Sequence, residues 1–192
     1  MTLDEAANIV ENTLPVPEER LTEPALILIS GLPGTGKTRV GRLIAQRLPS
    51  VIVESDYVRK LLFPTPTYTG PESGFVYGVC HAVIERLLAR GVAVVFDATN
   101  LVESKREVLY SMAERLQAKL VIVRVTAPPE VVLRRLDLRK ETPPAGQLSD
   151  ADWEVYLKLK PTEQRIRRPH FVVDTSRDFL QLLHKIVKAA AG

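Results

Sequence analysis

Short, mostly apolar runs alternate along this chain with longer segments whose apolar residues recur every three or four positions. The runs lie at residues 25–30, 51–53, 92–96, 119–125 and 171–173. Apolar runs of this length are typical of strands that are buried on both faces of a parallel sheet. The alternation with helical segments therefore predicts a doubly wound α/β domain, in which helices cover both faces of the sheet.

The segments between the runs have the spacing of amphipathic helices. This spacing is clearest at residues 38–48, 75–90, 103–117 and 128–140. A further helix is expected to end at Lys160, with Ser149 and Asp152 as its N-terminal cap. Prolines and glycines are frequent in residues 63–74, which are expected to form a loop.

The first residues of the chain follow a different pattern. Thr2 and Glu5 have the spacing of a capping box, which predicts a short helix over residues 2–13. The prolines that follow prevent regular structure before the first strand. We therefore expect residues 1–24 to be an N-terminal helix and proline-rich linker lying on the core, and residues 25–192 to form the main domain.

Composition places few limits on function. With 192 residues, 45% of them hydrophobic and 26% charged, the chain is ordinary for one globular domain. No apolar run approaches the ~20 residues of a membrane span, so no membrane partner is expected. The acidic N-terminus is unlike a secretory signal, and Cys80 is the only cysteine, so a cytoplasmic location is expected. The net charge of +3 is too small to indicate nucleic acid by itself.

Residues 31–38 fit the phosphate-loop pattern G-x-x-x-x-G-K-[ST] at every fixed position. An apolar strand precedes the pattern and a helix follows it, which is the arrangement that binds phosphate. Glycines allow the backbone N–H groups to turn toward an anion, and the helix N-terminus adds positive charge. We expect a nucleoside triphosphate, ATP or GTP, to be bound by Gly31, Pro33, Gly34, Thr35, Gly36, Lys37 and Thr38. Lys37 would reach the β- and γ-phosphates, and Thr38 would hold Mg²⁺.

An acidic residue also follows the third predicted strand. Asp97 comes directly after a buried run, as in the Walker B pattern, where the carboxylate helps to hold Mg²⁺. The alternative interpretation is a helix cap. Residues 98–100 continue toward the expected crevice, where they could contact the acceptor or the phosphates.

Asp56 and Arg59 follow the second predicted strand, three positions apart on an opening helix. Ligands of open parallel sheets bind beyond the carboxyl ends of the strands, so Asp56 is expected near the phosphates. An acid and a cation on one helix face suit a base that takes a hydroxyl proton and a cation that grips the acceptor. The alternative is an acid that stabilises the helix N-terminus beside a solvated arginine. The loop at residues 63–74 would lie beside this acceptor site, as a specificity element or as a plain connector.

Arg135 and Arg139 lie four positions apart near the end of a predicted helix. A Pro/Gly-rich stretch at residues 142–147 then interrupts the helix. This arrangement favours a helical lid over about residues 135–160, which closes arginines over the transferring phosphate. The alternative interpretation is a solvated basic face.

Together these motifs resemble the phosphate-loop kinases of the polynucleotide-kinase and zeta-toxin group, in most detail the phage-type 5′-hydroxyl polynucleotide kinases. In that family the Asp of an Asp-x-x-Arg pair is the general base and its Arg binds the acceptor's phosphate, matched here by Asp56 and Arg59. An Asp-Thr-Asn follows its third strand, and Asp97-Ala98-Thr99-Asn100 is similar with one residue inserted. A pair of lid arginines looks like Arg135 and Arg139. The insertion shifts Asn100, and no phosphatase or ligase module accompanies the chain. Gluconate kinases and chloramphenicol phosphotransferases share the loop and the lid arginines.

The prediction is a P-loop NTPase fold with a five-stranded sheet in the order 2-3-1-4-5, acting as a kinase on a hydroxyl-bearing acceptor. The first hypothesis for the acceptor is a 5′-hydroxyl nucleic-acid end, and the second is a small molecule. The third hypothesis is a nucleotide-dependent switch that recruits a protein partner. The expected catalytic residues are Lys37, Asp56, Arg59, Arg135 and Arg139, with Arg135 also contacting the nucleotide. The expected Mg²⁺ ligands are Thr38 and Asp97.

Overall fold

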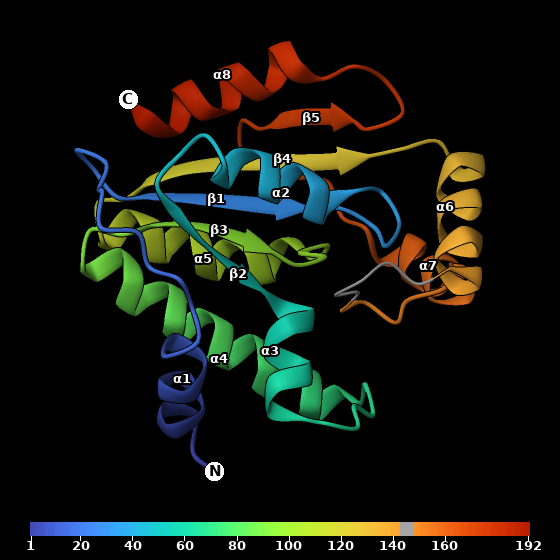
Figure 1. The fold of residues 1–192 in the computed structure, drawn as a ribbon, viewed down its shortest axis with the longest axis horizontal. Helices are drawn as coiled ribbons and strands as arrows, with labels where there is room; N and C mark the ends of the chain where they lie inside the picture. Colours follow the sequence, from blue (N-terminus) through green and yellow to red (C-terminus); the bar gives the residue numbers. More distant parts are fainter. Residues whose placement is uncertain (143–147) are drawn as a thin grey trace.

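A computed structural model describes residues 1–142 and 148–192 of the chain. Its strands are β1 (Ala25–Ser30), β2 (Ser50–Glu54), β3 (Ala93–Asp97), β4 (Lys119–Thr126) and β5 (Phe171–Asp174). They form one parallel sheet in the order β2-β3-β1-β4-β5 (Figure 1). The predicted strands, their direction and their order are confirmed.

The strands divide their side chains between two hydrophobic layers. Alternate residues of a strand point to opposite faces, so Leu26 and Leu28 of β1 join one core cluster, and Ile27 and Ile29 join the other. All of these side chains are fully buried, because helices cover both faces. The helices are α1 (Leu3–Glu11), α2 (Lys37–Ala45), α3 (Ser55–Leu62), α4 (Gly70–Ala89), α5 (Glu103–Arg115), α6 (Pro129–Glu141), α7 (Trp153–Leu159) and α8 (Leu180–Ala191), with a 3₁₀ turn at Lys160–Thr162.

Helices α2 and α8 pack on one face of the sheet, and α1, α4 and α5 contribute to the layer on the other. The predicted capping box of α1 is confirmed, because the Thr2 hydroxyl accepts from the Glu5 backbone at 3.2 Å and the Glu5 carboxylate accepts from the Thr2 backbone at 2.8 Å. Ala6, Ala7 and Val10 are fully buried in the same core as α4, so α1 is built into the hydrophobic layer.

Two predicted boundaries are wrong. Helix α4 begins at Gly70, inside the segment expected to be a loop, because Thr69 caps it and Pro71 lies in its first turn, where a missing N–H costs nothing. The N-cap of α7 is Asp152, whose carboxylate accepts from the Val155 backbone at 2.9 Å, so this helix begins at Trp153. Residues 143–147 of the expected lid loop lie outside the described residues. No helix in residues 1–142 or 148–192 is long and apolar enough to cross a membrane.

Candidate active site

The phosphate loop joins β1 to α2 at the carboxyl edge of the sheet. Gly36 caps α2 with a φ of +96°, and Gly34 has a φ of +76°, a region that side chains other than glycine rarely adopt. A Cβ at Gly34 would also lie 2.8 Å from Cγ1 of Val132 in α6. The loop therefore has the left-handed turns that direct backbone N–H groups toward an anion at a helix N-terminus.

Lys37 is the first residue of α2 and lies under this loop. Its ammonium donates to the carbonyl of Leu32 at 3.0 Å. Burial lowers the pKa of Lys37, although the negative charges of Asp97 and Asp56 oppose this effect. A cation held against a glycine-rich loop is placed to meet phosphate oxygens.

Thr38 and Asp97 form a hydrogen-bonded pair beside Lys37. The Thr38 hydroxyl donates to Oδ2 of Asp97 at 2.7 Å. Burial raises the pKa of Asp97, and Lys37 and the Thr38 hydroxyl oppose this effect. A hydroxyl and a carboxylate are oxygen ligands that suit Mg²⁺. Across the described ranges, no group of three or more His, Cys, Asp or Glu side chains is placed to hold a metal ion.

Glu54 is an acidic neighbour that sequence reasoning did not assign to the site. It ends β2 and is the register partner of Asp97 in β3. Burial raises the pKa of Glu54 to about 7, and the nearby charges of Asp97 and Asp56 add to the effect. Its position directly before Ser55-Asp56 was visible in the sequence, but its pairing with Asp97 depends on strand register.

Asp56 lies in the first turn of α3, beyond the carboxyl end of β2. Its negative charge acts to raise the pKa values of Lys37, Tyr68 and Arg139. Asp56 is thus within electrostatic range of Lys37, of Tyr68 in the loop before α4 and of Arg139 in α6.

Arg59 is buried one helical turn after Asp56, and a partner that the sequence did not indicate holds it there. Its guanidinium forms an ion pair with Glu72 of α4 and donates to the Ser73 hydroxyl at 3.3 Å. It also lies 4.9 Å from the centre of the Tyr68 ring. Its buried Nε has no hydrogen-bond partner among the described residues. Much of the cation predicted to grip the acceptor is therefore engaged within the protein.

The two arginines of α6 point to different parts of the site. Arg135 donates to the hydroxyl and carbonyl oxygens of Thr175, after β5, at 2.8 and 3.0 Å. It also reaches the carbonyls of Gly34 and Thr35 at 3.4 Å. Arg139 donates to the carbonyl of Ala151, and the charge of Asp56 acts on its pKa. Arg135 thus lies beside the phosphate loop, and Arg139 lies on the side of Asp56.

A small hydrophobic cluster packs α6 and α7 against the phosphate loop. Leu32 of the loop, Val132 and Leu136 of α6, and Tyr156 of α7 are all buried in it. Tyr156 stacks on Trp153 with ring centres 4.6 Å apart. Helices α6 and α7, which contribute to the predicted lid, therefore pack against the phosphate loop.

Asn100 forms hydrogen bonds with residues at the end of β1. Its Nδ2 donates to the carbonyl of Ile29 in β1 at 2.7 Å, and its backbone carbonyl accepts from the Ser30 hydroxyl at 3.0 Å. The residue adopts a φ of +45°. Asn100 therefore ties the loop after β3 to the end of β1, directly before the phosphate loop.

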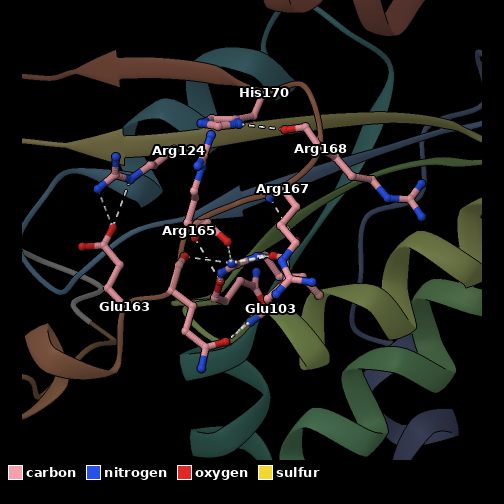
Figure 2. Close-up of polar contacts among 11 residues, drawn as sticks. Glu103, Arg124, Glu163, Arg165, Arg167, Arg168 and His170 are labelled. Atoms are coloured by element: carbon pink, nitrogen blue, oxygen red, sulfur yellow. Dashed lines mark hydrogen bonds and ion pairs between the residues drawn. The ribbon is translucent and has the colours of Figure 1, made fainter.

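A fully buried arginine, Arg106, forms hydrogen bonds with the same loop after β3. It donates to the carbonyls of Asn100 and Gln164 at 2.5 and 2.9 Å, and it forms an ion pair with Glu103 at 2.6 Å. The Glu103 carboxylate also accepts from the backbone N–H of Arg167 at 3.0 Å (Figure 2). Helix α5, the loop after β3 and the segment before β5 are thus joined in one ionic network.

The basic side chains near this network are largely matched by acidic ones. Figure 2 shows Arg124 donating to Glu163, with an Nη2–Oε1 distance of 2.9 Å. Arg168 forms ion pairs with Glu107 and Glu114. Arg124 and Arg168 are therefore each paired with a carboxylate.

Comparisons with known proteins agree with this geometry. L-seryl-tRNA(Sec) kinase of Methanococcus maripaludis is 23% identical over 172 residues, covering 85% of this chain and 65% of that relative's length. Kti12 of Chaetomium thermophilum, solved in complex with ADP-AlF3, has a TM-score of 0.71 at 20% identity and covers 88% of this chain and 100% of its own. A gluconokinase from Sinorhizobium meliloti 1021 has a TM-score of 0.60 at 22% identity, with 90% and 94% coverage.

The solved structures share the P-loop NTPase fold that the strand order and the phosphate loop define here. The model of one protein family, AAA_33, described as an AAA domain, matches residues 26–161. This match spans the phosphate loop, Asp56, Asp97 and both arginines of α6. The chain therefore belongs to the AAA_33 family of AAA domains.

Proposed function

We propose that this protein is a kinase that transfers the γ-phosphoryl group of ATP to an alcohol hydroxyl. The observation that carries this proposal is the convergence of Lys37, the Thr38–Asp97 pair and Asp56 at one edge of the sheet. Phosphoryl transfer depends mainly on positioning and on neutralising charge, and these groups can supply both. GTP remains an alternative donor for the same loop.

Each residue has a role that follows from its place. The loop N–H groups and Lys37 hold the triphosphate, and Thr38 and Asp97 hold Mg²⁺, which neutralises charge on the β- and γ-phosphates when it is bound. Asp56 accepts the proton of the acceptor hydroxyl as the new O–P bond forms and the bond to ADP breaks. Arg139, on the Asp56 side, stabilises the transferred charge, and Arg135 stabilises the nucleotide beside the loop. Arg59 positions the acceptor through the loop that it supports.

The first candidate acceptor is a 5′-hydroxyl nucleic-acid end. The Asp-x-x-Arg pair of Asp56 and Arg59, with its likeness to polynucleotide kinases, supports it. The name of the archaeal relative, L-seryl-tRNA(Sec) kinase, also indicates a hydroxyl carried by a nucleic acid for that protein.

The second candidate is a small hydroxyl compound. The hydrogen bond between the Tyr68 hydroxyl and Asp150, within electrostatic range of Asp56, supports it, because a closed contact near the base suits a small acceptor. A nucleotide-dependent switch, in which the ATP state recruits a protein, needs the phosphate loop but has no use for a base at Asp56.

The test is transfer of labelled phosphate from γ-labelled ATP to a short 5′-hydroxyl oligonucleotide, followed by a panel of nucleosides, sugars and hydroxyl-bearing antibiotics. Label in the oligonucleotide supports the first candidate, and label in a panel compound alone supports the second. ATP binding without transfer to any of these acceptors would contradict the kinase proposal and favour the switch.

A further inference from the structure

The loop between α3 and α4 is tied down by one buried carboxylate. Glu72 accepts from the backbone N–H and the hydroxyl of Thr67, both at 2.7 Å, and from the backbone N–H of Tyr68 at 3.2 Å. It also forms the ion pair with Arg59. The Thr67 hydroxyl is the main cause that lowers the pKa of Glu72 to about 2, so this carboxylate stays ionised at neutral pH. The loop is therefore fixed in one conformation, with Tyr68 at a φ of +54°.

This conformation carries the Tyr68 side chain across to the segment before α7. The phenol donates to Oδ2 of Asp150 at 2.5 Å, and the ammonium of Lys60 in α3 lies 2.9 Å from Oδ1 of the same carboxylate. The Tyr68 ring rests on the guanidinium of Arg59. Three parts of the chain that are far apart in sequence thus meet at Asp150.

The junction lies on the Asp56 side of α3, because Lys60 follows Asp56 by four residues and side chains at this spacing share a face of a helix. The carboxylate of Asp56 is within electrostatic range of Tyr68, and also of Arg139, which donates to the carbonyl of Ala151 next to Asp150. Lys37 faces Asp56 from the phosphate side. The contact of Tyr68 with Asp150 therefore lies near the carboxylate that the proposed mechanism uses as the base.

The contacts of Asp150 with Tyr68 and Lys60 are exposed and therefore weak enough to break. Tyr68 is 49% exposed, and the side chains of Asp150 and Lys60 are 48% and 32% exposed. Exposed contacts of this kind shift an equilibrium by about fivefold or less, so opening is within thermal reach. The loop that presents Tyr68 is held by buried groups, so opening is expected at the Asp150 end.

We propose that Tyr68, Lys60 and Asp150 form a clasp that selects acceptors by length. Closed, the clasp encloses a small acceptor and keeps water from the γ-phosphoryl group, whereas a polymer end requires it to open. The proposal rests on the proposed function, since it takes Asp56 as the base of a phosphoryl transfer. Tyr68 and Asp150 are specificity determinants here, and they are not required for the chemistry itself.

The test compares Tyr68→Phe, Asp150→Asn and the double variant with the native protein. Tyr68→Phe keeps the ring over Arg59 and removes only the donor to Asp150. The matched control is Asp137→Asn, which removes the same charge from an exposed position of α6 outside the clasp. Two acceptors present the same hydroxyl, a nucleoside 3′-monophosphate and a 5′-hydroxyl decanucleotide, and hydrolysis of ATP without acceptor is measured in parallel.

Each single variant is expected to raise acceptor-independent ATP hydrolysis about threefold to fivefold, and to raise the ratio of kcat/KM for the decanucleotide over the mononucleotide by a similar factor. Asp150→Asn also weakens the ion pair with Lys60, so its effect should equal or exceed that of Tyr68→Phe, and the double variant should match Asp150→Asn. Asp137→Asn should behave as the native protein does.

Native ATP binding with unchanged hydrolysis in the clasp variants overturns the clasp, whichever acceptor is used. Additive effects in the double variant overturn it as well. If neither acceptor is phosphorylated, the hydrolysis rates decide the question alone. A native protein that does not bind MgATP instead overturns the proposed function, and this outcome is seen without any variant.

Discussion

Three carboxylates, Glu54, Asp56 and Asp97, lie within electrostatic range of one another at the carboxyl ends of β2 and β3. Burial, together with the charges of the neighbouring carboxylates, raises the pKa values of Glu54 and Asp97. Asp56 and Asp97 could be predicted because each follows an apolar strand. Glu54 could not be assigned, because the register that pairs it with Asp97 is set only when the sheet forms.

The raised pKa of Glu54 predicts a pH-dependent stability. The folded protein binds a proton at this carboxyl more tightly than the unfolded chain does, so its contribution to stability falls as pH rises from about 4.5 to about 7. The Glu54→Gln variant has no carboxyl at this position, so the fall in stability with rising pH that Glu54 causes disappears. The unfolding temperature of the variant, relative to the native protein, should therefore be higher at pH 8 than at pH 5. Glu18→Gln, at an exposed position in the N-terminal linker, is the control, and parallel curves for Glu54→Gln and native protein would refute the prediction.

Among the helices and loops, the phosphate loop and α6 pack closely against each other. Gly34 of the loop approaches Val132 and Leu136 of α6 so closely that no Cβ fits. The glycine itself was predicted from the loop pattern, but its contact with α6 was not, since nothing local indicates which helix packs on the loop. The predicted start of α4 was too late, because the glycines and prolines around its first turn are also typical of a loop and Thr69 was not recognised as its N-cap.

Gly34→Ala should therefore weaken MgATP binding at least about tenfold, because an added Cβ meets Val132 and the left-handed backbone is strained. Gly74→Ala is the matched control, since its Cβ would meet nothing within 4 Å, and alanine favours the helix by about 0.5–1 kcal/mol. Titration calorimetry measures the affinity of both variants. Native affinity in Gly34→Ala would show that the loop tolerates a side chain here.

Arg106 joins three elements, and its loss should be costly. Replacing it with methionine removes the ion pair with Glu103 and the hydrogen bonds to three backbone carbonyls in a buried place, which costs about 3–5 kcal/mol of unfolding free energy. Arg115→Met, which breaks an exposed ion pair with Glu85, should cost less than about 1 kcal/mol. Urea unfolding compares the two variants. Equal costs would mean that the buried network adds nothing to stability.

At the scale of the whole molecule, the fold follows from local patterns that agree with one another. The strand order needed the resemblance carried by the phosphate loop, and the structure confirms it. The sequence alone could not show which side chains packing brings into contact. Arg59 and Glu72 lie 13 residues apart, and Arg135 and Thr175 lie 40 residues apart. Both arginines were predicted to face substrates, whereas each also has a protein partner that only the folded chain reveals.

In the proposed mechanism the phosphate loop binds ATP, and Asp56 is needed only for transfer. One experiment separates the two roles by comparing MgATP affinity and phosphoryl transfer in the native protein, Lys37→Ala and Asp56→Ala. We expect Lys37→Ala to lose both, and Asp56→Ala to keep the native affinity within about threefold while transfer falls at least about a hundredfold. Native transfer rates in Asp56→Ala would contradict the proposed mechanism, because the base would then lie elsewhere or have no role.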